Sequence, residues 1–455
     1  MKPTIKIAFD RGTLQVSGDR PALESAVWDA RSSSRRLPAF RFGELVAAAR
    51  REDSAIDGDL TRAWSLRAGD TSALDLRPYQ KDALVAWHAH ARRGVIALPT
   101  GAGKTRVAVA AILETGWPTA VLCPTKVLAS AWLSELSKWI RQPIGLIGDG
   151  ERRIERVTVL TFESAFRHMD GLGDRFGLLV VDEVHHFGSG ARIEALESSA
   201  AVARLGLTAT GPEPDSEAAH RLEELVGPVV YEMAYQDLVG KHLAPLRLTR
   251  IPVSLEADER ELYAAKTRIF NEMWRTLKRS SPGADQAALA RALARTPQGL
   301  RALRDHALAM GLASFPRAKR ALVRSLLENH RDDRSIVFTA YADNAYEVAV
   351  DSLIPVIAAE TSARERQDIL QRFRDGRVRA VASARVLNEG VDVPEARIAI
   401  IVAGVLGARE HVQRIGRVLR PGQGKEAVVY ELVTRETSDE RRAARRARHA
   451  SYASP

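Results

Sequence analysis

The sequence contains one cysteine, Cys123, and no run of about 18 or more apolar residues. A single cysteine excludes an intrachain disulfide and a cysteine-rich zinc site, and it fits a reducing compartment. Since no apolar run is long enough to cross a bilayer, no membrane partner is expected. Residues 1–6 also lack the apolar core of a signal peptide, so we expect a cytoplasmic protein.

The composition is that of a folded chain with an excess of positive charge. A length of 455 residues predicts about three domains. Apolar residues make up 45% of the chain and charged residues 27%, which excludes a wholly disordered or collagen-like protein. Lysine and arginine number 67 against 57 acidic residues, a net charge of +10. This excess favours a polyanionic partner, nucleic acid before a membrane surface, although many arginine-rich chains are simply soluble.

Residues 1–70 are predicted to form a small α+β domain. Apolar residues alternate along residues 4–16 around a turn at 10–12, which is the pattern of a β-hairpin. An amphipathic pattern predicts a helix near residues 42–50, and the polar stretch 51–70 is expected to be an irregular linker.

From residue 76 onward, short apolar runs alternate with helical patterns. The runs cover residues 95–98, 120–123, 157–160, 178–181, 205–207, 336–338, 380–382, 398–402 and 428–430. Continuous apolar runs between helices are typical of buried parallel strands, so the fold class is α/β. The runs form two sets, which predicts two parallel-sheet lobes over residues 71–245 and 246–455.

Residues 258–315 have a different texture, helical and strongly charged. Asp258 and Glu261 have the spacing of a helix-starting capping box, and a Ser-Ser-Pro-Gly run at 280–283 breaks the pattern. We interpret this segment as a helical hairpin inserted at the edge of the second lobe. The arginine-rich tail at 441–455 is expected to be helical.

A phosphate-binding loop is predicted after the first apolar run. Residues 98–105 read Leu-Pro-Thr-Gly-Ala-Gly-Lys-Thr between a strand and a helical pattern. Backbone amides and a helix N-terminus would face the phosphates there. Lys104 would reach the β- and γ-phosphates, and Thr105 would bind Mg²⁺. The first position is Leu98 instead of glycine, and a chance Gly-Lys-Thr in a turn is the alternative. The candidate nucleotide-binding residues here are Thr100, Gly101, Ala102, Gly103, Lys104 and Thr105.

A pair of acids follows another apolar run. Asp182 and Glu183 come at the carboxyl end of a predicted strand, where an open α/β sheet binds its ligand. Asp182 suits the Mg²⁺ shell, and Glu183 suits the polarisation of an attacking water. A capped strand end with two solvated acids is the alternative. A metal site built on His185 and His186 is weaker, since adjacent side chains diverge on a regular element.

Two further sites are weak when taken alone. Arg77 and Gln80 have planar groups suited to the edge of an adenine ring, although, taken alone, a simple surface loop is the favoured interpretation. Arg417 and Arg420 are three residues apart and share a helix face, where an arginine finger in cis would serve the γ-phosphate. A solvated basic helix face is the alternative.

In chain order, these motifs resemble those of superfamily 2 helicases and translocases. They are Arg-Pro-Tyr-Gln at 77–80, Gly-Lys-Thr at 103–105, Asp-Glu-Val-His at 182–185, Thr-Ala-Thr at 208–210, Gly-Val-Asp-Val-Pro at 390–394 and Gln-x-x-Gly-Arg-x-x-Arg at 413–420. With Asp29-Ala30-Arg31 and Leu37-Pro38-Ala39-Phe40-Arg41, the chain resembles the XPB family over nearly its full length, especially the compact archaeal and bacterial type.

The resemblance implies a damage-recognition-like domain at 1–70, two RecA-like lobes that clamp ATP, and a thumb-like insertion that grips DNA. Gln413 would help place the water near Glu183, and Gly390 and Asp392 would contact the nucleotide or couple it to the strand. The resemblance implies DNA contacts at Thr125, Thr161, Thr339 and Ser383. Further candidate phosphate contacts in the insertion, each equally explained as a solvated charge, are Lys266, Arg268, Arg275, Lys278 and Arg279.

The function implied is that of an ATP-dependent, 3′–5′ DNA helicase or translocase in nucleotide excision repair, acting as a nucleoid-associated monomer. One departure affects this function. Where the family has Arg-Glu-Asp after Thr-Ala-Thr, residues 211–215 keep only the final Asp215. A duplex translocase without strand separation, an ATP-switched scaffold that recruits a repair nuclease, and an RNA motor therefore stay open as alternatives.

Overall fold

The computed structural model describes residues 3–18, 25–58, 60, 74–188, 190–213, 215–238, 246–384, 396–403 and 427–449. The chain divides into two compact units, with the main division between residues 237 and 238. Five of the predicted site residues lie outside the described ranges. They are Gly390, Asp392, Gln413, Arg417 and Arg420.

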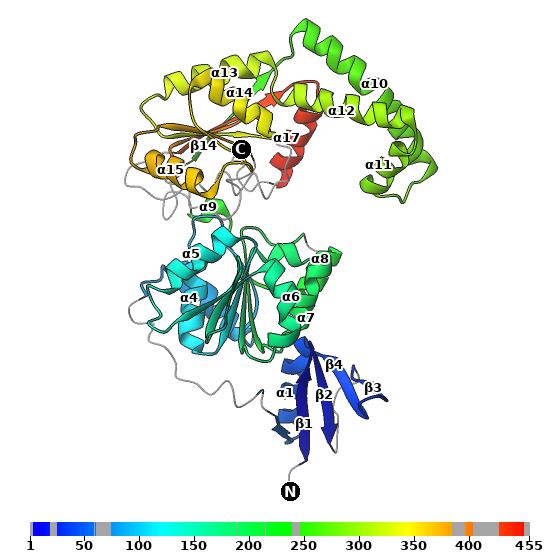
Figure 1. Cartoon of the computed structure of the whole chain (residues 1–455), viewed down its shortest axis with the longest axis vertical. Helices are drawn as coiled ribbons and strands as arrows, with labels where there is room; N and C mark the ends of the chain where they lie inside the picture. Colours follow the sequence, from blue (N-terminus) through cyan, green and yellow to red (C-terminus); the bar gives the residue numbers. More distant parts are fainter. Residues whose placement is uncertain are drawn as a thin grey trace. The chain divides into compact units, whose positions relative to one another are not determined.

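Five short strands and one helix form the N-terminal module (Figure 1). The strands are β1 (Thr4–Asp10), β2 (Thr13–Gly18), β3 (Val27–Asp29), β4 (Ser34–Pro38) and β5 (Ala55–Asp57). The short η1 (Ala39–Arg41) and the helix α1 (Phe42–Arg51) lie between β4 and β5 in the chain. The sheet order is β3-β4-β2-β1-β5, with only β1 and β5 parallel. The hairpin and the helix are confirmed.

The expectation of an irregular linker over residues 51–70 is wrong at β5. Ile56 pairs with Ile5 of β1, and Leu60 is buried in the core of the module. A strand of only three residues is too short to show an alternating pattern, so the sequence could not reveal it.

The N-terminal module and the first lobe share a hydrophobic core. Ala200 of the lobe belongs to the same buried cluster as the apolar residues of β1, β2 and α1, and Val202 packs against it. The β1–β2 turn is equally close, because a Cβ on Gly12 would lie 2.5 Å from the Ser198 hydroxyl. The two parts are therefore packed together as one folding unit.

The first lobe is built on an eight-stranded sheet with the order β13-β6-β12-β11-β7-β10-β8-β9. All pairs are parallel except β8 with β9, and the central strands are buried along their whole length, as the apolar runs predicted. The strands are β6 (Arg93–Ala97), β7 (Thr119–Cys123), β8 (Ile144–Gly148), β9 (Glu151–Arg153), β10 (Val157–Thr161), β11 (Leu178–Asp182), β12 (Ala203–Thr208) and β13 (Val229–Glu232).

Helices cover this sheet (Figure 1). They are α3 (Pro78–Ala89), α4 (Lys104–Thr115), α5 (Lys126–Leu136), α6 (Phe162–Leu172), α7 (Glu194–Glu197) and α8 (Glu217–Leu225), with the short η2 (Val184–Phe187) and η3 (Ala191–Ile193). The short helix α9 (Tyr235–Leu238) lies where the chain divides into its two units. Parallel strands need such crossover helices, which bury the remaining face of each strand.

The second lobe holds a six-stranded, fully parallel sheet with the order β14-β19-β18-β15-β17-β16. Its elements are β14 (Leu246–Val253), α13 (Arg317–Asn329), β15 (Ser335–Thr339), α14 (Ala342–Ser352), β16 (Val356–Ile357), α15 (Ala363–Arg374), β17 (Ala380–Ala384), β18 (Ile398–Ile401), β19 (Ala427–Thr434) and α17 (Ser438–His449). Each predicted apolar run of this half lies in one of these strands. The predicted α/β fold with two parallel-sheet lobes is confirmed.

The charged insertion of the second lobe contains three helices, not the expected two. They are α10 (Ala257–Ser280), α11 (Gln286–Ala294) and α12 (Pro297–Ser314). The break at Ser280 is confirmed, but the helix start at Asp258 is wrong. The capping box is formed two residues earlier, where the Glu256 amide donates to the Glu259 carboxylate at 3.1 Å. Glu256 and Glu259 are three residues apart, like Asp258 and Glu261, so the spacing alone could not distinguish the two pairs.

Aromatic residues hold the insertion together. Phe270 of α10 stacks on His306 of α12 with ring centroids 3.8 Å apart, and Trp274 stacks on Phe270 at 5.3 Å. Phe270 is buried, so its ring serves packing between the helices and not contact with a base.

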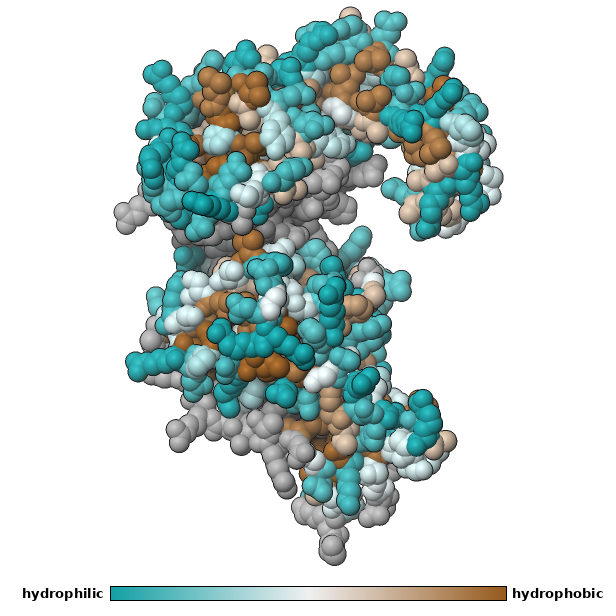
Figure 2. Space-filling view, in the orientation of Figure 1, coloured by the Kyte–Doolittle hydropathy of each residue, from teal (hydrophilic) through white to brown (hydrophobic). Residues whose placement is uncertain are grey.

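Hydrophilic residues dominate the face of the molecule seen in Figure 2. Among the helices of the described ranges, none combines the length and apolar character needed to cross a membrane.

Candidate active site

The loop between β6 and α4 has the geometry of an anion cradle. Gly101 and Gly103 have φ angles of +86° and +83°, which non-glycine residues rarely adopt. Gly103 is the N-cap of α4, so the positive end of the helix and its free amides face the loop. The Lys104 ammonium donates to the Leu98 carbonyl at 3.0 Å. The Thr100 hydroxyl is buried and has no hydrogen-bond partner within the described residues, so the cradle contains a polar atom suited to a ligand.

Side chains at the start of α3 hold this loop in place through hydrogen bonds. The Tyr79 hydroxyl and the Gln80 amide each donate to the Ala102 carbonyl at 2.8 Å. Gln80 also accepts from the Arg77 backbone amide at 3.0 Å, and the Arg77 guanidinium donates to the Tyr79 hydroxyl at 3.2 Å. Gln80 is 2% exposed, so its side chain supports the loop in this geometry. The sequence reasoning missed Tyr79, although it lies inside the motif that named its neighbours.

The acid pair lies on the same edge of the sheet as the loop. Asp182 pairs with Leu207 of β12, and the following residue of β12 pairs with Ala97 at the end of β6. The Asp182 carboxylate is buried and accepts from the Trp132 indole and from the Glu183 amide, each at 3.0 Å.

Burial raises the pKa of Asp182 above its ordinary value. The Trp132 hydrogen bond, the charge of Lys104 and the Glu183 amide oppose this rise. Burial also raises the pKa of the Cys123 thiol, and the negative charge of Asp182 adds to that rise. A bound cation would favour the charged form of this carboxylate.

Glu183 is held in a left-handed conformation with a φ of +50°. Such strain in a non-glycine residue is typical of functional sites. Its carboxylate lies 3.5 Å from the His185 ring, and His185 is also 3.2 Å from the Thr208 hydroxyl. The His185 and His186 ring centroids are 4.4 Å apart, but the described ranges contain no group of three or more acidic, histidine or cysteine residues able to hold a metal.

Two candidate DNA-contact threonines continue the same edge. Thr125 lies two residues after β7, Thr161 is the last residue of the adjacent strand β10, and they cap α5 and α6. Their hydroxyls accept from the Leu128 amide at 3.3 Å and the Ser164 amide at 3.2 Å. Each hydroxyl therefore already caps a helix, and the helix N-terminus beside it is the feature left to face a phosphate.

In the second lobe, Thr339 and Ser383 lie on the paired strands β15 and β17 and are fully buried. The Thr339 hydroxyl donates to the Tyr341 carbonyl at 2.9 Å. The Ser383 hydroxyl has no hydrogen-bond partner within the described residues.

The basic residues of the insertion are mostly exposed on α10. Lys266 forms an ion pair with Asp305 at 2.8 Å, so its charge is partly balanced. The other four are exposed, namely Arg268, Arg275, Lys278 and Arg279.

The sequence reasoning missed Trp132, because nothing in the pattern of residues 126–136 marks one tryptophan as a partner of Asp182.

Comparisons with known proteins define the class. Residues 73–213 match the family described as type III restriction enzyme, res subunit, and residues 318–422 match the helicase conserved C-terminal domain. The crystal structure of the Pyrococcus furiosus Hef helicase domain matches 82% of this chain and 98% of that chain with a TM-score of 0.52. At 18% identity this likeness shows the fold alone. The chain is thus a helicase with two RecA-like lobes, as predicted.

Residues 7–58 match the damage recognition domain of the xeroderma pigmentosum group B helicase. The "DNA 3′-5′ translocase XPB2" of Sulfurisphaera tokodaii is 36% identical, over 82% of this chain and 84% of that protein. The "DNA 3′-5′ helicase XPB" of Mycobacterium tuberculosis is 31% identical, and the match covers 82% of this chain and 63% of that protein. The chain belongs to the XPB family of DNA helicases and translocases, which confirms the predicted family and enzyme class.

Proposed function

We propose that this chain is an ATP-driven motor that moves 3′–5′ along DNA and opens duplex DNA during nucleotide excision repair. The observation that carries the proposal is the position of the glycine-containing loop and the Asp182–Glu183 pair on one carboxyl edge of a parallel sheet. A loop that binds phosphate and an acid pair beside it are the parts that hydrolysis of a nucleoside triphosphate requires. The names of the relatives, a DNA 3′-5′ translocase and a DNA 3′-5′ helicase, support DNA as the polymer along which the motor moves.

ATP and Mg²⁺ are the nucleotide and metal of this proposal. Lys104 would bind the β- and γ-phosphates, while Thr105 and Asp182 supply the hard oxygen donors that Mg²⁺ prefers. When bound, Mg²⁺ neutralises charge on the phosphates. Glu183 would orient and polarise the attacking water. Arg77 and Gln80 would adjoin the adenine, with Gln80 also holding the loop through Ala102.

The remaining roles concern the transition state and the track. Gln413, Arg417 and Arg420 would complete the site around the γ-phosphate, and Gly390 and Asp392 would couple the nucleotide to the strand. The proposed backbone contacts are the helix-cap residues Thr125 and Thr161 and the strand residues Thr339 and Ser383. On the insertion, the proposed phosphate contacts are Lys266, Arg268, Arg275, Lys278 and Arg279. Ion pairs between these side chains and DNA phosphates would make the affinity for DNA depend on salt concentration.

Lys104→Ala tests the proposal directly. Because the ammonium would neutralise the transferred phosphate, we expect DNA-stimulated ATP hydrolysis to fall at least 100-fold. Lys138→Ala is the matched control, since that lysine is 60% exposed in the same lobe, just beyond the end of α5, and pairs with Glu135 of that helix. A Lys104→Ala protein with full ATPase activity would refute the assignment of the loop.

Arg417→Ala tests the arginine finger. The variant is expected to bind ATP with nearly unchanged affinity and to lose most of its turnover, because the guanidinium would act only as charge develops. An unchanged kcat would exclude this role.

A second candidate function is translocation on duplex DNA without strand separation. Two observations favour it: the relative from Sulfurisphaera tokodaii is named a translocase, and residues 211–215 keep only Asp215 of the Arg-Glu-Asp element. A strand-displacement assay beside a triplex-displacement assay separates the two candidates. Triplex displacement without strand displacement would favour the translocase.

The surroundings of the motor also belong to the proposal. We expect a monomer that acts on the chromosome in the cytoplasm, with a repair nuclease as its partner. Sedimentation with and without forked DNA would measure the stoichiometry, and a stable dimer in both conditions would contradict the monomer.

A further inference from the structure

The β3–β4 hairpin of the N-terminal module exposes a large aromatic side chain that the fold does not use. Trp28 is 62% exposed, and no ring contact is found for it within the described residues. Single exposed apolar side chains are common on protein surfaces, so exposure alone indicates nothing. The charged groups around the indole and the rigidity of the hairpin are what mark this surface.

The nearest cross-strand neighbour of Trp28 is a cation. Trp28 of β3 is paired with Arg35 of β4, so both side chains lie on the same face of the sheet, with Cβ atoms about 5 Å apart. Arg35 is exposed, and no acidic partner is found for it in the described part of the chain. Arg31, in the turn between the two strands, has a side chain that is 90% exposed. The Arg31 guanidinium is bound by Asp29, whose carboxylate lies with Arg36 on the opposite face, so Arg35 is the cation on the Trp28 face. An indole face beside an exposed guanidinium group fits a base with a flanking phosphate.

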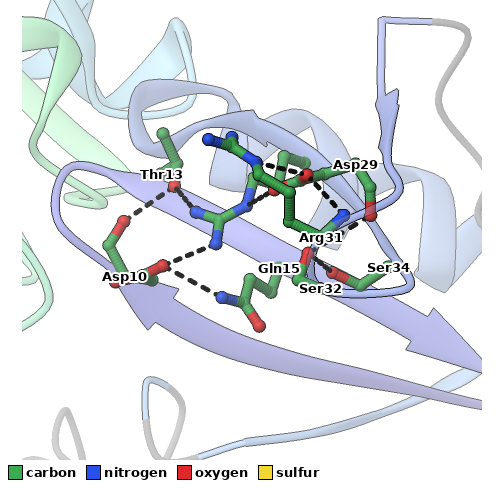
Figure 3. A network of polar contacts seen from close by, with 8 residues as sticks. Asp10, Thr13, Gln15, Asp29, Arg31, Ser32 and Ser34 are labelled. Atoms are coloured by element: carbon green, nitrogen blue, oxygen red, sulfur yellow. Dashed lines mark hydrogen bonds and ion pairs between the residues drawn. The ribbon is translucent and has the colours of Figure 1, made fainter.

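The opposite face of the hairpin is fixed by a polar network (Figure 3). Arg36 donates to Thr13 at 3.0 Å and to Asp10 at 2.7 Å, and its Nε lies 2.8 Å from the Asp29 carboxylate. Gln15 adds a bond to Asp10 at 3.0 Å. These contacts join β3 and β4 to the β1–β2 turn.

The turn itself is closed by Asp29. The Asp29 carboxylate accepts from the Arg31 backbone amide and from its Nε, each at 3.0 Å, and the Ser32 and Ser34 hydroxyls are 2.8 Å apart. These bonds lower the pKa of Asp29 to about 2, so it stays charged at neutral pH. The hairpin is therefore ordered before any partner binds, which reduces the entropic cost of binding.

The hairpin also points away from the first lobe. The lobe is met at Gly12, in the turn that begins β2, whereas Arg35 pairs with Val16 toward the other end of that strand. The surface around Trp28 is thus left open by the packing that joins the module to the lobe.

We propose that Trp28 and Arg35 form a stacking site for an unpaired base in locally opened DNA. The site rests on the proposed function, since it names what the N-terminal module would hold while the motor works. A protein strand added to the edge of β3 is the competing occupant. It is disfavoured because β3 is three residues long, too short for a stable ladder, and because the cross-strand neighbour of Trp28 is the exposed cation Arg35.

The test uses the full-length protein without nucleotide and a 30-base-pair DNA duplex with a central three-nucleotide bubble that carries 2-aminopurine. Trp28→Ala is expected to weaken binding to the bubble about fivefold or more, since one base–aromatic stack is worth that much. It should also abolish the quenching of 2-aminopurine, and binding to the fully paired duplex should change less than twofold. Trp28→Phe should retain most of the affinity. Arg35→Ala should reduce the slope of log affinity against log salt by about 1.

Val27→Ala is the matched control, because Val27 is 71% exposed on the same strand but lies on the opposite face, paired with Arg36. Equal losses in Val27→Ala and Trp28→Ala, or bubble affinity of Trp28→Ala within twofold of the parent, would overturn the proposal. So would a dimer that Trp28→Ala dissociates while bubble affinity stays unchanged, since that result assigns the edge to a second copy of the chain. Failure of the motor is distinguishable, because it appears as absent DNA-stimulated ATPase activity in the parent protein, whereas the bubble assay needs no hydrolysis.

Discussion

A buried ion pair in the second lobe offers the sharpest test of how that lobe is stabilised. Lys319 of α13 is 0% exposed, and its ammonium donates to the Asp439 carboxylate at 2.8 Å and to the Val402 carbonyl at 2.5 Å. Asp439, in the first turn of α17, also accepts from the Thr434 amide at 3.1 Å. One charge pair therefore joins two helices to the carboxyl ends of β18 and β19.

The magnitude follows from the burial. Removing one partner of a buried pair leaves an uncompensated charge, which costs about 3–5 kcal/mol of the free energy of unfolding. For a lobe of this size, each 1 kcal/mol lowers Tm by about 2–4 °C, so Asp439→Asn should lower the Tm of the second lobe by about 6–20 °C. In Lys319→Met combined with Asp439→Asn, neither charge is left alone, so the loss should be well below the sum of the two single losses.

The measurement is differential scanning calorimetry of the full chain, with hydrogen exchange assigning the transition to the second lobe. Arg317→Ala is the control, since Arg317 lies on the same helix but is 59% exposed, and its exposed ion pairs with Glu256 and Asp258 are expected to contribute little to stability. A Tm for Asp439→Asn within 2 °C of the parent, or strictly additive losses in the double variant, would refute the reasoning.

Three further predictions concern the site and the insertion. Gly103→Ala should lower kcat for ATP at least tenfold, because its φ is +83° and the added Cβ would lie 2.4 Å from the glutamine amide that holds the loop; Gly150→Ala, with a φ of +84° and open space around it, should leave kcat unchanged. Trp132→Phe removes a hydrogen bond to charged Asp182 and so should raise the pKa of that carboxyl further, moving the acid limb of the pH–kcat profile to higher pH; an unmoved limb would exclude the link. Burial lowers the pKa of His306, so the unfolded chain takes up its proton first as pH falls below about 6.5, and stability is lost there; His306→Phe should remove that loss, measured as Tm between pH 7.5 and 5.5.

The strands were predictable from the sequence because burial on both faces leaves a visible trace. A central parallel strand must be apolar along its whole length, and β7, β11 and β15 are continuous runs of buried residues. Short edge strands leave no such trace. For that reason β5 was expected to be irregular, and α11 was not separated from the helix that follows it.

The site was predictable in part for a different reason. Glycines, a lysine and paired acids next to a strand end are chemically unusual, so their order points to phosphate binding. The residues that support them are chemically ordinary, and only their neighbours in space give them a role. Tyr79 and Trp132 contact the Ala102 carbonyl and the Asp182 carboxylate through polar atoms at the edge of apolar rings. The guanidinium of buried Arg204 donates to four backbone carbonyls, and no pattern in the sequence around it predicts this buried structural role.

The core that the N-terminal module shares with the first lobe makes the two parts thermodynamically inseparable. Ala200 is fully buried among side chains of the module, so melting the module would expose part of the lobe to water. We therefore expect a single cooperative transition for the two, and a fragment that ends at residue 58 should aggregate or stay partly unfolded. A change of sequence at Gly12 or Ala200 would then be felt in both parts at once, which ties the divergence of the small module to that of the lobe beside it.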